Sequence, residues 1–201
     1  VMIRECGKSR TEAIGEVEEV ADLFEEYANQ LEAADGYTLK MDSLDPREQN
    51  VSVLKPFGVW AVLSPFNFPT ALAGGPISAA LLAGNTVVFK PASATAISGY
   101  ELVRAMHDAG VPKEALEFVT GGGGEVGDYL VHHKDIGGVV FTGSKEVGME
   151  VYTTFAQDFP KPVITEMGGK NPTIVTKSAD LTKAIEGVAR SAFGFSGQKC
   201  S

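Results

Sequence analysis

Residues 138–148 read GVVFTGSKEVG, and this stretch decides the fold class. The run Val139-Val140-Phe141 does not alternate with polar residues, as expected of a strand that is buried on both faces. A glycine and a serine follow, and the pattern of a helix begins directly after them. A buried strand that turns at once into a helix is typical of α/β proteins with a parallel sheet.

The same order of strand, turn and helix recurs on both sides of this stretch. Crossovers of this length join parallel strands, so the sequence predicts an α/β fold with a mainly parallel sheet and helices on both of its faces. Strands are expected at 59–63, 86–90, 116–120, 138–142 and 163–166, and helices at 72–83, 98–109, 126–133 and 145–155.

Three further segments lie outside this alternation. Near the start, Ser9 and Glu12 form a capping box for a long amphipathic helix. Residues 37–56, with a turn at Asp45-Pro46, are interpreted as an exposed hairpin arm. A strand at 173–175 and a helix that opens near Asp180 are expected before the final loop. The apolar face of the long helix is expected to consist of Ile14, Val17, Ala21, Phe24, Ala28 and Leu31.

Composition excludes several functional classes. The 201 residues carry 17 Lys and Arg against 26 Asp and Glu, a net charge of −9 without any basic cluster, so a nucleic-acid or membrane partner is not expected. No apolar run approaches the roughly 20 residues of a membrane span, and the first residues do not resemble a signal peptide, which predicts a soluble, cytoplasmic protein. Cys6 and Cys200 form no disulfide framework. Because the chain begins with Val1 and ends in a loop, we expect it to be part of a longer protein.

Candidate binding residues are those that follow the strands, because ligands of such sheets bind at the carboxyl ends of the strands. The turn at 143–148 follows a strand and opens a helix, so its backbone amides could hold a phosphate. It lacks the Lys-Ser/Thr pair of a Walker A loop and the three glycines of the dinucleotide fingerprint. Taken alone, such a turn is more often an ordinary helix start.

Three residues could carry out chemistry. Cys200 follows Gly-Gln-Lys, where a neighbouring cation could lower the pKa of the thiol and make it a nucleophile, although a lone cysteine is more often a small core residue. Glu166 ends an apolar strand and could act as a general base through desolvation, or simply form a cap or an ion pair. Asn67 could stabilise an oxyanion or close a turn. The three histidines lack metal-ligand spacing, so no metal site is predicted.

Taken together, these signals occur in an order that resembles the aldehyde dehydrogenase superfamily. The resemblance extends over nearly the whole chain, and the spacing of Glu166 and Cys200 also fits it. The matching segments are 65–69 (PFNFP), 84–91 (GNTVVFKP), 141–144 (FTGS) with Gly148, 166–172 (EMGGKNP) and 197–200 (GQKC).

The resemblance implies oxidation of a small-molecule aldehyde to a carboxylic acid. Cys200 would attack the aldehyde, and the Asn67 amide and the Cys200 backbone N–H would hold the oxyanion. Glu166 would activate the water that hydrolyses the resulting thioester. The implied cofactor is NAD, but NADP stays open because Ser93 stands where many relatives carry a glutamate.

The resemblance also implies which residues contact the cofactor. Lys90 would bind the adenosine ribose, Gly143 and Ser144 would meet the pyrophosphate, and Gly123 and Gly127 would let a helix approach the adenine. The complete implied set is Ser64, Pro65, Phe66, Lys90, Ser93, Gly123, Gly127, Phe141, Thr142, Gly143, Ser144, Val147, Gly148, Met167 and Gly168.

By the same resemblance the chain divides into four parts. Residues 1–36 would be the helical start of a Rossmann-like cofactor-binding domain, and 37–56 an arm that pairs subunits of a homo-oligomer. Residues 57–168 would complete the dinucleotide-binding domain, and 169–201 would begin an α/β catalytic domain. The final stretch is most similar to the branch that oxidises glutamate semialdehyde in proline breakdown, in which Ser201 would help to seat the substrate carboxylate.

Two other functions stay open from the sequence. A non-catalytic dinucleotide-binding module would keep the turn at 143–148 but would not need Asn67, Glu166 and Cys200 together. An acylating enzyme that releases its thioester to coenzyme A would use Cys200 but would not need Glu166. We expect the 201 residues alone to be inactive, since most substrate-binding residues would lie in the following segment.

Overall fold

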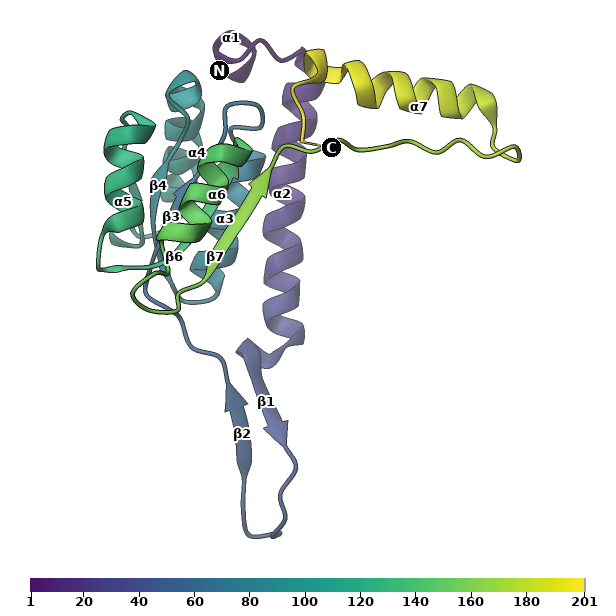
Figure 1. Cartoon of the computed structure of the whole chain (residues 1–201). Coiled ribbons are helices and arrows are strands. Elements are labelled where there is room, and N and C mark those ends of the chain that lie inside the picture. The colour runs from purple at the N-terminus through teal and green to yellow at the C-terminus, as the bar shows by residue number, and fades with distance from the viewer. Residues whose placement is uncertain (201) are drawn as a thin grey trace.

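The computed structural model describes residues 1–200, and its centre is a five-stranded sheet (Figure 1). The spatial order is β5-β4-β3-β6-β7, and every neighbouring pair is parallel. The predicted parallel sheet is therefore confirmed. The strands are β3 (Val59–Leu63), β4 (Thr86–Lys90), β5 (Leu116–Phe118), β6 (Ile136–Gly143) and β7 (Val163–Met167).

Helices cover both faces of this sheet (Figure 1). Trp60 and Val62 of β3 belong to one core with α3 and α4, whereas Ala61 and Leu63 belong to a second core with α5 and α6. Neighbouring residues of one strand are thus buried on opposite faces, which explains the uninterrupted apolar runs. The helices are α1 (Met2–Glu5), α2 (Arg10–Ala33), α3 (Ala71–Leu82), α4 (Ala96–Asp108), α5 (Asp128–His132), α6 (Lys145–Thr154) and α7 (Leu181–Phe193).

Helix α2 begins as predicted but buries a different face. The capping box is present, and hydrogen bonds from Ser9 lower the pKa of Glu12. Ile14 and Val17 are 60% and 56% exposed, however, while Glu16 on the adjacent face is buried. The predicted stripe is wrong at these two positions and at Ala21, which is also exposed. The pattern of apolar residues does not reveal a buried charge that has a partner in the fold.

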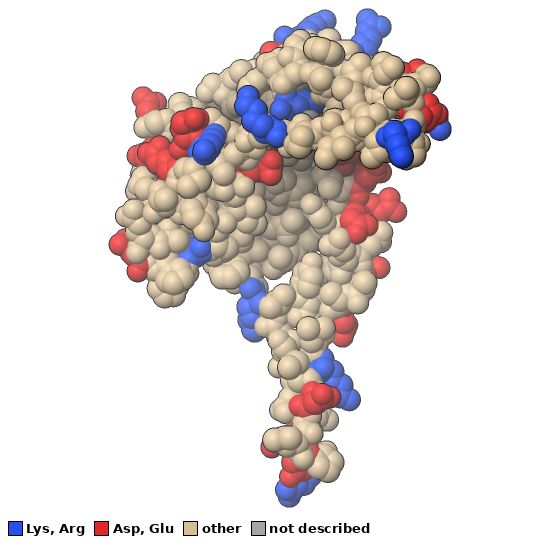
Figure 2. Space-filling model, turned by 45° about the vertical axis from the view of Figure 1, so that its right-hand side comes forward, with Lys and Arg blue, Asp and Glu red and all other residues tan. Residues whose placement is uncertain are grey.

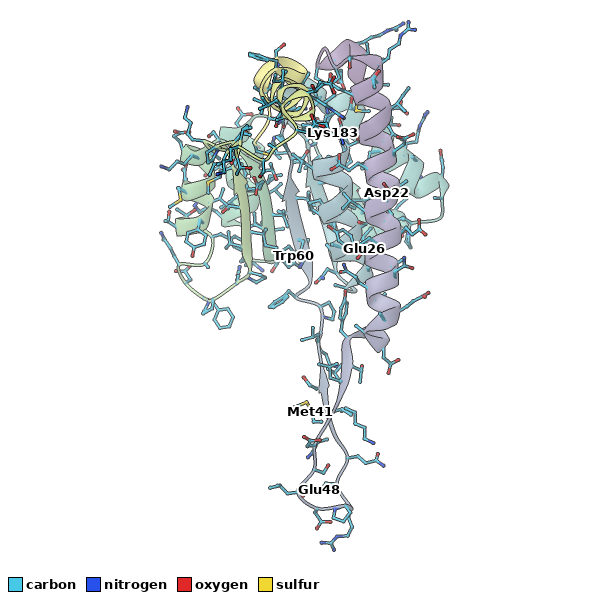
Figure 3. The ribbon with its side chains drawn as sticks, turned by 90° about the vertical axis from the view of Figure 1, so that its right-hand side faces the viewer. Asp22, Glu26, Met41, Glu48, Trp60 and Lys183 are labelled. Atoms are coloured by element: carbon cyan, nitrogen blue, oxygen red, sulfur yellow. The ribbon has the colours of Figure 1, made fainter. Side chains whose placement is uncertain are left out.

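Residues 37–56 form the predicted hairpin arm. Strand β1 (Thr38–Met41) pairs antiparallel with β2 (Asn50–Val53), and Thr38 lies opposite Val53. The arm projects from the sheet, with the labelled Met41 and Glu48 far from Trp60 (Figure 3). Both strands are exposed over most of their length. An isolated two-stranded hairpin is only marginally stable in water, so this arm is expected to need a packing partner.

The segment after β7 differs from expectation in one respect. Residues 173–175 form no strand, because no other strand among residues 1–200 lies beside them to share hydrogen bonds. The chain instead runs outward from the sheet and returns through α7 (Figure 1). The predicted helix near Asp180 is confirmed, and the Asp180 carboxylate caps it by accepting hydrogen bonds from the backbone amides of Thr182 and Lys183.

The described residues include no helix that is long and apolar enough to cross a membrane. Lys and Arg side chains lie scattered over the face shown in Figure 2 and do not gather in one patch there.

Gly138 in β6 provides a test of how tightly the sheet packs. A Cβ atom at this position would lie 2.5 Å from Cε2 of the buried Trp60, so the ring or the strand would have to shift. We expect Gly138→Ala to lower the free energy of unfolding by about 1–3 kcal/mol. The matched control is Gly15→Ala in α2, where a Cβ atom meets nothing within 4 Å and a gain of about 0.5–1 kcal/mol is expected. Equal urea midpoints for the two variants would contradict this account.

Candidate functional site

A cavity of about 290 Å³ opens at the carboxyl ends of β3, β4 and β6. The chain leaves β3 for β4 and β5 on one side and returns to β6 on the other, so β3 and β6 flank the point where the strand order reverses. Parallel sheets bind their ligands at such a point, because the loops on either side diverge there.

Six of the predicted cofactor residues line this cavity. The predicted residues that do not line it are Pro65, Phe66, Ser93, Thr142, Gly143, Ser144, Gly148, Met167 and Gly168, which lie at or after the ends of the strands. Those that line it are Ser64, Lys90, Gly123, Gly127, Phe141 and Val147.

Most residues on the helical wall of the cavity were not predicted from the sequence. Val147, Glu150, Val151 and Thr154 share one face of α6, and this helical spacing could have revealed them once Val147 was placed at the site. The complete set of missed lining residues is Leu63, Gly124, Asp128, Val131, His132, Glu150, Val151 and Thr154.

Two polar side chains in the cavity wall fit a ligand rich in hydroxyl groups. The Ser64 hydroxyl is buried and has no hydrogen-bond partner among the described residues. A buried polar group without a partner is rare in a folded protein and suits a site that a ligand completes. The ammonium of Lys90 is also buried and donates to the Pro91 carbonyl at 3.1 Å. Burial lowers the pKa of Lys90. A dinucleotide, which carries ribose hydroxyls and phosphates, fits this wall.

The glycine turn after β6 serves packing as well as binding. Ser144 caps α6 by accepting a hydrogen bond from the Val147 amide at 3.3 Å, so the first turn of this helix opens at the sheet edge. A Cβ atom on Gly148 would lie 2.5 Å from Sδ of Met167. Gly148 therefore allows α6 to approach β7 closely. This packing explains the glycine at position 148 independently of the cofactor contact that the sequence predicted for it.

Asn67 and the Cys200 loop meet at the same edge of the sheet. The side-chain amide of Asn67 donates to the Gln198 carbonyl at 2.8 Å. The Asn171 side chain donates to the Cys200 carbonyl at 2.5 Å, which ties the loop to the segment after β7. Asn67 thus contacts the loop that carries Cys200, although the two are far apart in the sequence, and Cys200 itself is half-buried.

Glu166 is placed differently from what the sequence suggested. It lies in β7 opposite Thr142, at the edge of the sheet, and its side chain is exposed. Within residues 1–200 its carboxylate makes no hydrogen bond or ion pair, so the desolvated setting that we expected is not present. The predicted substrate contact Ser201 lies outside the described residues.

Known proteins match the chain along its whole length. The 1-pyrroline-5-carboxylate dehydrogenases of Anoxybacillus flavithermus and Staphylococcus epidermidis are 44% and 43% identical to it. Each alignment includes 100% of this chain but only 40% of the relative, so the chain spans about two fifths of the length of these relatives.

Solved structures agree with these matches. Proline utilization A from Bdellovibrio bacteriovorus has a TM-score of 0.92 and 42% identity, over 98% of this chain and 21% of that one. NADP-dependent glyceraldehyde-3-phosphate dehydrogenase from Bacillus halodurans, solved with NADP, has a TM-score of 0.88 and 38% identity, over 100% of this chain and 42% of that one. The model of the aldehyde dehydrogenase family matches residues 1–201. This chain therefore belongs to the aldehyde dehydrogenase family.

Proposed function

We propose that the protein carrying this chain oxidises an aldehyde to a carboxylic acid with a nicotinamide dinucleotide. The observation that carries the proposal is the hydrogen bond from the Asn67 amide to the Gln198 carbonyl, which joins a candidate oxyanion donor to the loop of a candidate nucleophile. The names of the relatives support L-glutamate 5-semialdehyde as the substrate and L-glutamate as the product.

Cys200 and Asn67 carry out the first step of the proposed reaction. The Cys200 thiolate attacks the aldehyde carbon, and the carbonyl oxygen becomes the oxyanion of a thiohemiacetal. The Asn67 amide carries two hydrogens, of which the Gln198 carbonyl accepts one, so the other can serve the oxyanion together with the Cys200 backbone N–H. Positioned donors of this kind stabilise the charge as it develops.

The cavity residues would hold the cofactor for the second step. The Ser64 hydroxyl, the Lys90 ammonium and the first turn of α6 would bind the ribose and phosphate groups. A nicotinamide dinucleotide held there would accept the hydride from the thiohemiacetal carbon. Once that hydride has left, the substrate remains on Cys200 as a thioester.

Glu166 completes the reaction by taking a proton from the water that hydrolyses the thioester. Its exposed carboxylate is accessible to solvent water.

The test of this function is to incubate the protein with glutamate semialdehyde and NAD, with and without coenzyme A, and to identify the product. We expect free glutamate at the same rate in both samples. A requirement for coenzyme A would show that the thioester is released by acyl transfer to coenzyme A and not by hydrolysis. A failure to oxidise any aldehyde would refute the proposal.

Ser93 offers a test of cofactor preference. Its exposed hydroxyl donates to the Gly121 carbonyl at 3.4 Å, at the carboxyl end of β4 close in sequence to Lys90. Ser93→Glu should raise the ratio of kcat/KM for NAD to that for NADP by about tenfold, because a carboxylate binds ribose hydroxyls and repels a 2′-phosphate. Ser93→Gln is the uncharged control. An unchanged ratio in the glutamate variant would show that Ser93 does not face the ribose.

The hairpin arm is proposed to pair subunits of a homo-oligomer. Leu39 and Val51 on its two strands are each 60% exposed, so the arm presents apolar surface that a second copy of the protein would cover. We expect the double variant Leu39→Lys/Val51→Lys to sediment as a smaller species than the unmodified protein, and Lys40→Arg on the same arm to leave the mass unchanged. An unaltered mass in the double variant would exclude these side chains from the subunit interface.

A further inference from the structure

Lys8 and Glu16 form an ion pair in which both side chains are completely buried. Lys8 lies just before α2, and Glu16 lies in the second turn of that helix. Taking two charges out of water costs free energy that their attraction often does not recover, so a buried pair is poor evidence for stability alone. The groups that each partner contacts point to another role.

Glu16 holds the loop that carries Asn67. One of its carboxylate oxygens accepts hydrogen bonds from the Thr70 amide at 2.7 Å, the Thr70 hydroxyl at 2.8 Å and the Ala71 amide at 3.1 Å. These amides are at the start of α3, whose own N-cap residue makes no side-chain cap. Glu16 therefore caps α3 from another helix and fixes the chain three residues beyond Asn67.

Lys8 contacts both loops of the proposed site. Its ammonium lies 3.3 Å from the ring centroid of Phe68, the residue after Asn67, and 5.4 Å from that of Phe195 in the turn before Cys200. Both distances lie within the range of cation–π attraction. Phe195 is the only buried residue between Gly168 and Cys200, a range that the structure describes completely. This ring therefore anchors the Cys200 loop to the rest of the chain.

We propose that Lys8 and Glu16 are positioning residues, which set the Asn67 amide and the Cys200 loop at their working separation. The inference rests on the proposed function for the roles of Asn67 and Cys200. Glu16 fixes the Asn67 loop at the start of α3, and Lys8 links Phe68 to Phe195, so one buried charge pair fixes both loops. Both side chains are completely buried, and neither lines the cavity that contains Ser64 and Lys90.

A double-mutant cycle separates positioning from simple stabilisation. In the active protein, Lys8→Met should lower kcat by about 10- to 100-fold, with the dissociation constant for NAD unchanged, because a small misplacement of reacting groups has an effect of this size. In an Asn67→Ala background the same change should lower kcat by a clearly smaller factor, because no amide is left to position against the Cys200 loop. Lys8→Arg should retain more activity than Lys8→Met.

Glu5 provides the matched control. Its carboxylate caps α4 in the same manner, accepting hydrogen bonds from the Ile97 amide at 2.8 Å and the Ser98 amide at 2.7 Å, but α4 carries none of the proposed reacting groups. Glu5→Gln should lower the melting temperature without coupling to Asn67. If the kcat effects of Lys8→Met and Asn67→Ala multiply independently, the inference fails while the proposed function stands.

A second measurement does not depend on activity. Hydrogen exchange followed by mass spectrometry should show faster exchange in residues 66–71 and 194–200 of the double variant Lys8→Met/Glu16→Gln, which removes both charges together. The Glu5→Gln protein should exchange normally in these two segments. Unaltered exchange in the double variant would overturn the inference, even if the protein oxidised no aldehyde and the proposed function had failed on its own test.

Discussion

Cys200→Ala should lower kcat/KM for aldehyde oxidation by roughly 10⁴-fold or more, because no other group can form the covalent intermediate. Dinucleotide binding should persist, since Cys200 does not line the cavity that contains Ser64 and Lys90. NADH absorbance measures the first effect, and calorimetric titration with NAD measures the second.

Cys6→Ala is the control for this variant. Cys6 is the other half-buried thiol of the chain, and it donates to the Met2 carbonyl at 3.3 Å, within the N-terminal segment. This substitution should leave turnover unchanged. Normal turnover by Cys200→Ala, or loss of turnover in Cys6→Ala, would contradict the assignment of the nucleophile.

Glu166→Gln should slow steady-state turnover by about 100-fold or more, because a general base contributes an effect of this size to the step that it serves. The loss should fall on hydrolysis of the thioester and not on its formation. Mixing enzyme, NAD and aldehyde rapidly should therefore give one equivalent of NADH per site, followed by a stall.

Glu117→Gln is the matched control for Glu166. Glu117 is an exposed carboxylate in β5, the strand at the opposite edge of the same sheet. Its loss should change neither the burst nor the steady state. A Glu166→Gln protein without a burst would show that Glu166 acts before the thioester forms.

Most of the sheet could be predicted from the sequence because its signals are local. Apolar runs such as 139–141 and the turns that follow them identify a strand that is buried on both faces without knowledge of its neighbours. The prediction of a strand at 173–175 was wrong because a strand also needs a partner strand elsewhere in the chain, and the local pattern does not show whether one is present. Glu166 similarly lies on an edge strand, and its exposure depends on what covers that edge.

The site was predictable only in part. The resemblance of segments such as 65–69 and 197–200 pointed to the proposed reacting residues, but not to their contact through the Gln198 carbonyl. The helical wall that contains Glu150 depends on the rotation of α6 against the sheet, which packing decides. Lys8 and Glu16 gave no signal, because lysine and glutamate usually lie at the surface and their burial appears only in three dimensions.

The most direct test of the central claim is the mass of the Glu166→Gln protein after reaction with NAD and glutamate semialdehyde. We predict one covalent glutamyl adduct per chain, formed in step with the NADH burst and located by peptide mapping at Cys200. Continued NADH production by a protein that carries no adduct, or an adduct located at Cys6, would contradict the account.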